Sequence, residues 1–360
     1  MSFLSVEAGS KRAGRPRPSI EGRSRHTALL SSAQDIALRL ADKPGVVGVV
    51  LAGGVARGYA DELSELDLIV YLDPDAVTRW AAGAAPYPAG DALADGIYTD
   101  ISYVDWSAEA GGDWPMVKRW DRSYAVILHD PVGRVHRLYR EKVPFGPGEV
   151  ERLAGQSLSQ CDAPLFNDLP SWLRRQDFAA AHLALNRIIP ALVALAFLAN
   201  AELIPSDKWA LHLSRTLAWQ PADWQARIEG LIQVKAASLQ DAERRRALAL
   251  GLHQELGQRC LGPEVKTFPI SYYASRYQIL ASLLKEGSLP LAEFSRRFGA
   301  WRLMTSPACY VLKLNGNGEG RYVSLDTRAV VDLAAGRGGV DLLQWDHTVL
   351  VELAKLIQPS

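Results

Sequence analysis

The chain has 360 residues, 48% of them hydrophobic, and its 40 Lys and Arg residues balance its 40 Asp and Glu residues. This length leaves room for about two or three domains and a substantial core, and the neutral charge argues against a protein built for long nucleic-acid contacts. The three cysteines (Cys161, Cys260 and Cys309) lie far apart, which excludes a disulfide framework and a CxxC metal site and is typical of a cytoplasmic protein with reduced thiols.

The first residues, 1–26, are basic and rich in Gly, Pro and Ser, and they lack the apolar centre of a secretory signal. This composition predicts a disordered basic tail. The most apolar run, IIPALVALAFLAN (188–200), is shorter than the roughly 18 residues that a membrane helix needs, and it contains Pro190. We therefore expect a buried core helix there and no membrane span.

Residues 27–146 have the pattern of an α/β (α+β) domain with a mixed sheet. A helix is predicted over 31–43, where apolar residues recur at helical spacing until Pro44 and Gly45 break the pattern. Strands are predicted in VVGVVLAG (46–53), LDLIVYL (66–72), GIYTDISYVDW (96–106) and SYAVILHDPVGRVHRL (123–138), the last ending in a turn at Asp130 and Pro131.

From about residue 147 the period becomes helical. We expect a helical bundle domain over 147–262 and a small C-terminal α+β extension over 263–360. Within the extension, ACYVLKLNGNGEGRYVSL (308–325) places two β-rich runs around an Asn- and Gly-rich loop, which predicts a hairpin.

The run LAGGVARGYADELSELDLIVYL (51–72) contains two carboxylates in a predicted buried strand. Side chains alternate along a strand, so Glu65 and Asp67 share one face, about 6 to 7 Å apart. Two like charges at this distance are costly to bury, and Mg²⁺ is a natural compensator because it prefers carboxylate oxygens and phosphates. The alternative is a solvated strand end at which both carboxylates face water.

A glycine turn and a cation precede these carboxylates. Gly53 and Gly54 allow a tight turn that offers amide groups to anionic oxygens, and Arg57 carries a guanidinium suited to phosphate. The run contains neither the Gly-Lys-Ser/Thr of a Walker loop nor GxGxxG spacing. It therefore indicates phosphates on the turn and a metal on the strand.

This combination resembles the signature of the DNA polymerase β-type nucleotidyltransferase superfamily. In that signature an apolar residue, Gly, and Gly or Ser are followed, after a short helix, by an acidic-x-acidic pair on a strand. The form here is similar to bacterial kanamycin and lincosamide nucleotidyltransferase-like proteins with a helical C-terminal domain, and IPSDKW (204–209) resembles a Pro-x-x-Lys-Trp run of their bundles. The resemblance implies that Gly53 and Gly54 line the triphosphate.

The resemblance also implies a metal site. Glu65 and Asp67 would bind Mg²⁺, or Mn²⁺ in its place, and a third carboxylate would come from the next core strand. Asp100 is the candidate for that position and Asp105 is its rival. One residue departs from the family pattern, because the first metal carboxylate is usually Asp and here it is Glu65.

Two further residues have both a functional and a structural interpretation. Lys208 would reach the nucleotide phosphates from the bundle, or it is a surface lysine beside a packed Trp209. Ser64 would assist the metal site through its hydroxyl, or it only ends the preceding loop.

Together these features predict a nucleotidyltransferase that moves a nucleoside monophosphate from a nucleoside triphosphate, ATP, to a hydroxyl of a small-molecule acceptor. Glu65 and Asp67 would hold the metal, and Asp100 would complete a second metal site or accept the proton of the acceptor. Two rival functions stay open: transfer to RNA or protein, and a non-catalytic relative that only binds nucleotide.

Overall fold

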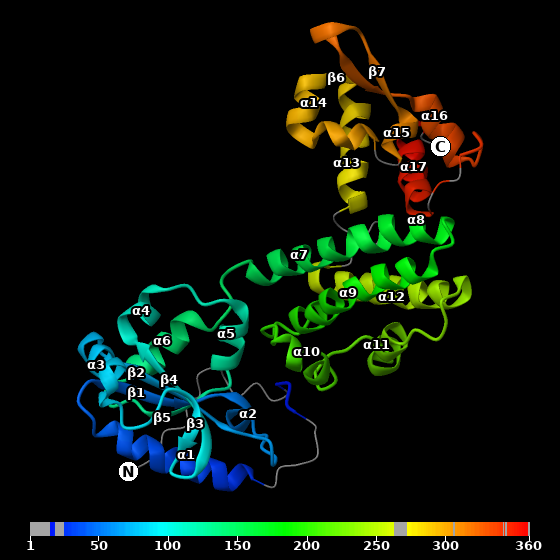
Figure 1. Cartoon of the computed structure of the whole chain (residues 1–360). Helices are drawn as coiled ribbons and strands as arrows, with labels where there is room; N and C mark the ends of the chain where they lie inside the picture. Colours follow the sequence, from blue (N-terminus) through cyan, green and yellow to red (C-terminus); the bar gives the residue numbers. More distant parts are fainter. Residues whose placement is uncertain are drawn as a thin grey trace. The chain divides into compact units, whose positions relative to one another are not determined.

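The chain forms two compact units in the computed structural model, which describes residues 15–18, 25–262, 272–304, 307–340, 342 and 344–358 (Figure 1). The first unit is Met1–Val150 with Ala196–Trp224, and the second is Glu151–Leu195 with Gln225–Ser360. This division differs from the three parts predicted above. Residues 196–224, expected in the bundle, belong to the first unit, and the rest of the bundle shares a unit with the C-terminal extension.

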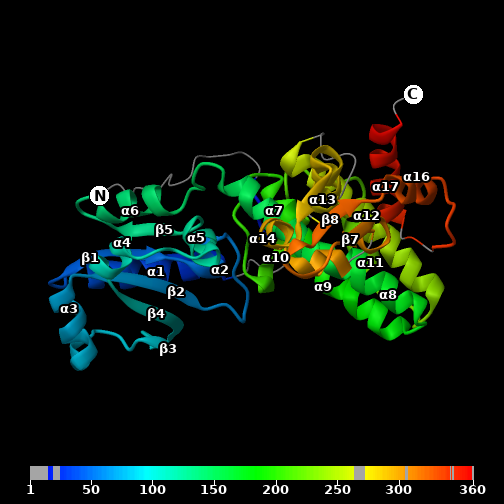
Figure 2. The ribbon, with the colours of Figure 1, turned by 90° about the horizontal axis from the view of Figure 1, so that it is seen from above.

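A five-stranded mixed sheet organises the first unit (Figure 2). Its order is β3-β4-β2-β1-β5, in which only β2 and β4 run parallel. The strands are β1 Val46–Leu51, β2 Leu66–Leu72, β3 Gly90–Ala94, β4 Ile97–Asp105 and β5 Val126–His129. The α/β class and the mixed sheet are as predicted, whereas β3 was not predicted and the strand expected within 123–138 occupies only β5.

Short helices connect these strands. They are α2 Gly53–Ala56, α3 Pro74–Arg79, the helical turn η1 Trp80–Ala84, α4 Trp106–Gly111, α5 Met116–Arg122 and α6 Arg134–Lys142, with α10 Asp207–Ser214 coming from the second stretch of the unit. Helix α6 begins after Gly133, whose φ is +71°, so the chain turns into a helix where strand pairing ends.

The core of the first unit explains why β1, and β2 apart from Asp67, carry a continuous apolar run. Helix α1 (His26–Ala41) begins before the predicted start and buries an i, i+3, i+4 stripe in one cluster with β1. On the other side α6 packs so closely that a Cβ on Gly48 would lie 2.5 Å from Val135 Cγ2. Both sides of the strand are therefore covered, which favours a continuous apolar run over alternation.

Four residues of the predicted disordered tail are packed against the first unit. The Arg15 guanidinium donates to the backbone oxygen and to Oγ of Ser123, both at 2.8 Å, and Arg17 N donates to Thr216 Oγ1 at 3.1 Å. Pro16 and Pro18 are buried. The prediction of disorder does not hold for these four residues, because the Arg15 guanidinium and the backbone of Pro16 and Arg17 bond to groups far away in sequence. Residues 1–14 and 19–24 lie outside the described residues.

Helices dominate the second unit. Three of its helices, α7, α9 and α11, cross a unit boundary by a few residues. Its elements are α7 Glu149–Ala163, η2 Pro164–Asp168, α8 Leu169–Arg174, α9 Phe178–Leu198, α11 Trp224–Ile232, α12 Leu239–Leu261, α13 Tyr272–Glu286, β6 Ser288–Pro290, α14 Leu291–Phe298, η4 Ala300–Met304, α15 Ala308–Val311, β7 Leu312–Asn315, η5 Gly318–Gly320, β8 Tyr322–Leu325, α16 Thr327–Ala334 and α17 Gln344–Ile357. Strands β7 and β8 pair antiparallel, which confirms the predicted hairpin, and β6 completes a three-stranded sheet.

Helix α9 contains the most apolar run of the sequence. By length and composition alone it is long enough to cross a membrane, but 67% of its most apolar window is buried inside the protein. Pro190 lies within it without ending it. The burial agrees with the predicted core helix.

Candidate active site

The glycine turn and Asp67 pack directly against each other at the end of β1. Ala52 is extended and its N–H donates to the backbone oxygen of Asp67 at 2.9 Å. Gly53 follows with a φ of +65°, and a Cβ there would lie 1.7 Å from Asp67 Oδ2. Two reasons therefore require glycine at position 53. Its backbone is left-handed, and the Asp67 carboxylate occupies the space that a side chain would need.

Asp67 and Asp100 lie side by side on the two parallel strands. They are register partners of β2 and β4, so their side chains leave the same face of the sheet from strands about 4.8 Å apart. Burial raises the pKa of Asp67 to about 6. Nearby charges act on it as well: three carboxylates raise this pKa and one guanidinium lowers it (Glu65, Asp121 and Asp100; Arg57).

The rival carboxylate, Asp105, is the N-cap of α4. It ends β4 and caps α4, where its Oδ1 accepts hydrogen bonds from Ser107 N at 2.7 Å and Ala108 N at 3.3 Å. Together with the Ser107 hydroxyl these donors lower the pKa of Asp105. The structure therefore brings Asp100, and not Asp105, beside Asp67.

Two cavities adjoin Asp67. The first, of about 340 Å³, we call the sheet cavity; it is lined by Ala52, Gly53, Arg57, Asp67, Leu68, Ile69, Asp100, Ser102, Val117, Trp120, Asp121, Arg122, Ser206 and Trp209. The second, of about 360 Å³, we call the turn cavity; it is lined by Gly54, Arg57, Tyr59, Asp61, Leu63, Ser64, Glu65, Asp67, Lys208 and Trp209. All of these residues belong to the first unit. Asp67, Arg57 and Trp209 border both cavities.

Glu65 lies on the side of the turn cavity. Strand β2 begins at Leu66, as predicted for LDLIVYL, so Glu65 precedes the strand instead of sharing a strand face with Asp67. It lines the turn cavity with Asp67, whereas Asp100 lines the sheet cavity. Within the described part of the chain, no three His, Cys, Asp or Glu side chains converge closely enough to hold a metal ion. The three carboxylates predicted as one ligand set are thus divided between two cavities that share Asp67.

A pair of these carboxylates still fits a divalent cation. Asp67 is partly buried, its pKa is raised, and three further carboxylates contribute to the increase, so a positive charge would relieve the repulsion. Carboxylate oxygens are the donors that Mg²⁺ prefers, and this ion usually takes only one or two of them from the protein when phosphates supply the rest.

Arg57 is buried and already holds an ion pair. Its Nη1 lies 2.7 Å from Asp121 Oδ1, and its guanidinium lies over the rings of Trp120 at 4.8 Å and Trp209 at 5.2 Å. Asp121 also pairs with Arg122 at 2.5 Å. Among the described residues, Arg57 Nε has no hydrogen-bond partner. The predicted phosphate ligand is therefore held in place by its ion pair and by two aromatic rings, at the border of both cavities.

Sequence reasoning missed Trp120, Asp121 and Arg122 from α5. A signal for them exists in the strand pairing, because Leu51 of β1 is the register partner of Val126 of β5. In an antiparallel pair, residues before Val126 come to lie beside residues after Leu51, which is where the glycine turn begins.

Ser64 closes a local turn. Its hydroxyl donates to Asp61 Oδ1 at 2.8 Å and accepts from Asp61 N at 2.8 Å, while Tyr59 donates its own hydroxyl to the same carboxylate. These bonds already use the Ser64 hydroxyl, so the structural interpretation of this residue is the better one.

Lys208 and Trp209 reach the site from α10. Exposed Lys208 lines the turn cavity with Glu65, and Trp209 packs its ring edgewise on Tyr59, with 6.1 Å between ring centroids. The structure thus brings the second stretch of the first unit to the glycine turn, as the functional interpretation of Lys208 requires.

Comparisons with known proteins leave the family open. No family model matches the chain, and no curated protein matches it. Among solved structures, eleven chains match. One is a nucleotidyltransferase-like protein from Exiguobacterium sibiricum, at 13% identity and a TM-score of 0.39, covering 82% of this chain and 98% of that one. A likeness of this size does not establish a shared activity, so the function has to be inferred from the site.

Proposed function

We propose that this protein is a metal-dependent nucleotidyltransferase that transfers a nucleoside monophosphate from a nucleoside triphosphate, ATP, to a hydroxyl of a small-molecule acceptor. The observation that carries the proposal is the fit between Gly53 and Asp67, with Asp100 beside them on the parallel strand. A glycine turn whose side-chain space is filled by a carboxylate brings backbone amides and paired acidic groups to one point.

The glycine turn and Lys208 would bind the triphosphate. The first amides of a helix have no acceptor within that helix, so the N–H groups at Gly53 and Gly54 are suited to phosphate oxygens. Lys208 adds a mobile positive charge on the turn-cavity side. Arg57, fixed by Asp121 and two tryptophans, would keep its charge at the border of both cavities with little loss of side-chain entropy on binding.

Asp67 and Glu65 would hold the Mg²⁺ ion, for which Mn²⁺ is a substitute. When bound, the ion would neutralise charge on the phosphates. Asp100, the register partner of Asp67, would accept the proton of the acceptor hydroxyl. The acceptor oxygen then forms its bond to the α-phosphorus, the bond from that phosphorus to the bridging oxygen breaks, and pyrophosphate leaves with the electron pair.

The test is pyrophosphate release from ATP and Mg²⁺ across a panel of hydroxyl compounds. Asp67→Asn keeps the shape of the side chain and removes its charge, so we expect release to fall by about a thousandfold or more. Asp75→Asn, an exposed carboxylate at the start of α3, is the matched control and should behave as wild type.

Three outcomes would contradict the proposal. Full release by a well-folded Asp67→Asn protein would remove Asp67 from the reaction. Release only with RNA or a protein as acceptor would favour transfer to a macromolecule. Mg²⁺-assisted ATP binding without release, for any acceptor, would indicate a relative that binds nucleotide and does not transfer it.

A further inference from the structure

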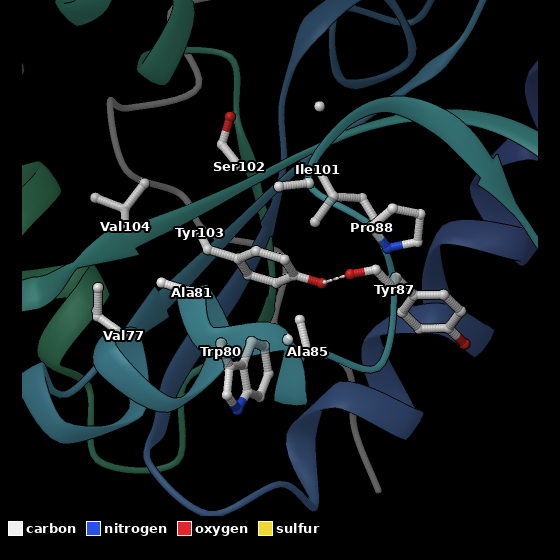
Figure 3. A pocket seen from close by; sticks show the side chains of 13 residues that line it. Val77, Trp80, Ala81, Ala85, Tyr87, Pro88, Ile101, Ser102, Tyr103 and Val104 are labelled. Atoms are coloured by element: carbon white, nitrogen blue, oxygen red, sulfur yellow. Dashed lines mark hydrogen bonds between the residues drawn. The ribbon is translucent and has the colours of Figure 1, made fainter.

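The largest of the cavities described in the first unit lies outside the site above. It measures about 800 Å³ and borders the outer edge of β4, where β3 stops pairing (Figure 3). The last β3–β4 register pair is Gly90 with Ile101, so β4 continues beyond its β3 partner. Its walls are β4 on one side and η1 with residues 85–90 on the other. We call it the edge pocket.

The lining of the edge pocket is uncharged. Small residues (Ala81, Gly83, Ala85 and Ala89) leave the space, and aromatic rings bound it. Tyr103 donates its hydroxyl to the backbone oxygen of Tyr87 at 2.8 Å, and Trp80 packs edgewise on the Tyr103 ring at 4.9 Å between centroids. The ring positions are therefore held, and the hydroxyl of Tyr103 is already engaged. Such a pocket suits a flat, apolar group.

Ser102 connects the edge pocket to the candidate active site. It lines both the edge pocket and the sheet cavity, which contains Asp67 and Asp100. Figure 3 shows Ser102 and Tyr103 leaving β4 on opposite sides, so Ser102 shares its face with Asp100, two residues earlier. That spacing is roughly 7 Å along the strand.

We infer that the edge pocket binds the apolar ring of the acceptor, whose hydroxyl reaches past Ser102 to Asp100. The inference rests on the proposed function and specifies its substrate class: an uncharged aromatic or alicyclic alcohol. A polyhydroxylated sugar does not fit, because the lining offers few polar partners for several buried hydroxyls.

The test uses 2-naphthol, an aromatic alcohol, and two neighbouring substitutions. Ala81 lines the edge pocket, whereas Ala82 does not, and both are exposed on η1. We expect saturable binding of 2-naphthol to the wild-type protein in calorimetry without nucleotide. Ala81→Trp should weaken this binding roughly tenfold or more, Ala82→Trp should leave it unchanged, and sorbitol should not compete.

The binding measurement separates this inference from the proposed function. Asp67→Asn should remove transfer and leave 2-naphthol binding intact. If no acceptor supports pyrophosphate release but 2-naphthol binds as expected, the proposed transfer activity is contradicted, whereas the binding of an apolar ring in the edge pocket is supported. Where release occurs, Ala81→Trp should raise KM for aromatic alcohols and leave KM for ATP as it is.

Equal binding of 2-naphthol to the wild-type, Ala81→Trp and Ala82→Trp proteins would overturn the inference, as would efficient competition by sorbitol. So would a concentration-dependent dimer that Ala81→Trp abolishes and Ala82→Trp does not, because the edge pocket would then hold a second copy of the chain.

Discussion

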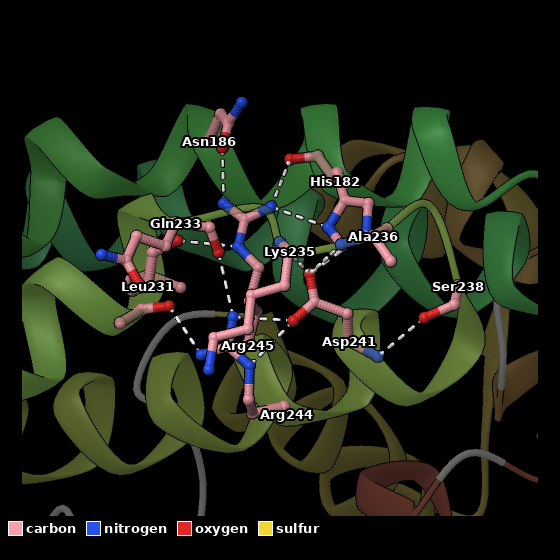
Figure 4. A network of polar contacts seen from close by, with 11 residues as sticks. His182, Asn186, Leu231, Gln233, Lys235, Ala236, Ser238, Asp241, Arg244 and Arg245 are labelled. Carbon is pink, nitrogen blue, oxygen red and sulfur yellow. Dashed lines mark hydrogen bonds and ion pairs between the residues drawn. The ribbon is translucent and has the colours of Figure 1, made fainter.

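Two buried arginines, one in each unit, show how a structural cation differs from one at a candidate site. In the second unit Arg245 is 0% exposed and is enclosed by acceptors (Figure 4). Its donors reach Leu231 O at 2.7 Å, His182 Nδ1 at 2.8 Å and Asn186 Oδ1 at 2.5 Å. His182 in turn bonds through Nε2 to Ala236 O at 2.9 Å, so the network ties α9 to α12 and the segment before it.

Arg57 in the first unit is buried to a similar degree but is not enclosed. It pairs with one carboxylate, is flanked by two tryptophans, borders two cavities and keeps Nε without a partner among the described residues. Natural proteins satisfy nearly all buried polar groups. Arg245, whose donors are satisfied inside the second unit, therefore serves packing, whereas Arg57 borders two cavities in which it can meet a ligand.

Removal of each guanidinium should give the largest difference between the two arginines. Arg245→Met leaves several buried acceptors without a donor and should lower the free energy of unfolding by about 3 kcal/mol. Arg57→Met should lower it by about 1 kcal/mol or less, because Asp121 keeps Arg122, yet it should weaken ATP binding. Urea unfolding and calorimetry measure both quantities. Equal destabilisation by the two changes, with ATP binding intact, would show that the two arginines do not differ in kind.

A second pair of substitutions compares the cost of a side chain at the two glycines of the turn, Gly53 and Gly54. Gly53→Ala combines a left-handed backbone with a collision against the Asp67 carboxylate, and should cost about 3 kcal/mol. The control is Gly54→Ala, where a Cβ would lie 3.4 Å from the nearest atom, Tyr59 O, and the expected cost is about 1 kcal/mol or less. Thermal unfolding checks both. An unchanged stability of the Gly53→Ala protein would mean that the Asp67 carboxylate does not pack against the turn.

The third prediction concerns pH. Asp67 has a pKa of about 6 in the folded protein against 3.8 as its ordinary value, so the folded state binds the extra proton between these two pH values. Stability should therefore fall as the pH rises from about 4 to about 6. Asp67→Asn should be more stable than wild type by about 3 kcal/mol at pH 8, with the difference vanishing below pH 4. Urea titrations at several pH values test this, and a constant difference at every pH would contradict it.

The smallest effect separates the two rival carboxylates of β4. Asp105→Ala removes the cap of α4 and should cost about 1 kcal/mol with pyrophosphate release unchanged. Asp100→Ala should do the reverse, losing release with little loss of stability. A loss of release in Asp105→Ala would reverse the choice between them.

Much of the secondary structure of the first unit could be predicted from local sequence patterns. The continuous apolar runs located β1 and β2, and the paired glycines located the turn, because both depend on neighbours in sequence. The hairpin of β7 and β8 was predictable for the same reason. Glu65 was predicted to lie on the strand, but it directly precedes the first residue of β2. The ends of a strand depend on its pairing partners as much as on its own residues.

What escaped prediction depends on contacts between distant segments. Asp121 reaches Arg57 only because β5 pairs with β1, and Ser64 is occupied only because the chain turns back onto Asp61. The docking of Arg15 on Ser123 likewise needs the folded surface to exist first. No period or spacing in the sequence encodes such meetings.

The division of the first unit into two stretches of chain also bears on how this protein could evolve. Lys208 and Trp209 are encoded well apart from the glycine turn that they adjoin, with Glu151–Leu195 of the other unit between them. A gene fragment that ends before residue 196 would lack Lys208 and Trp209, so any transfer of the complete site has to carry Glu151–Leu195 as well. Lineages that keep this chemistry must keep the helical segment too, and the two would be inherited as one linked block.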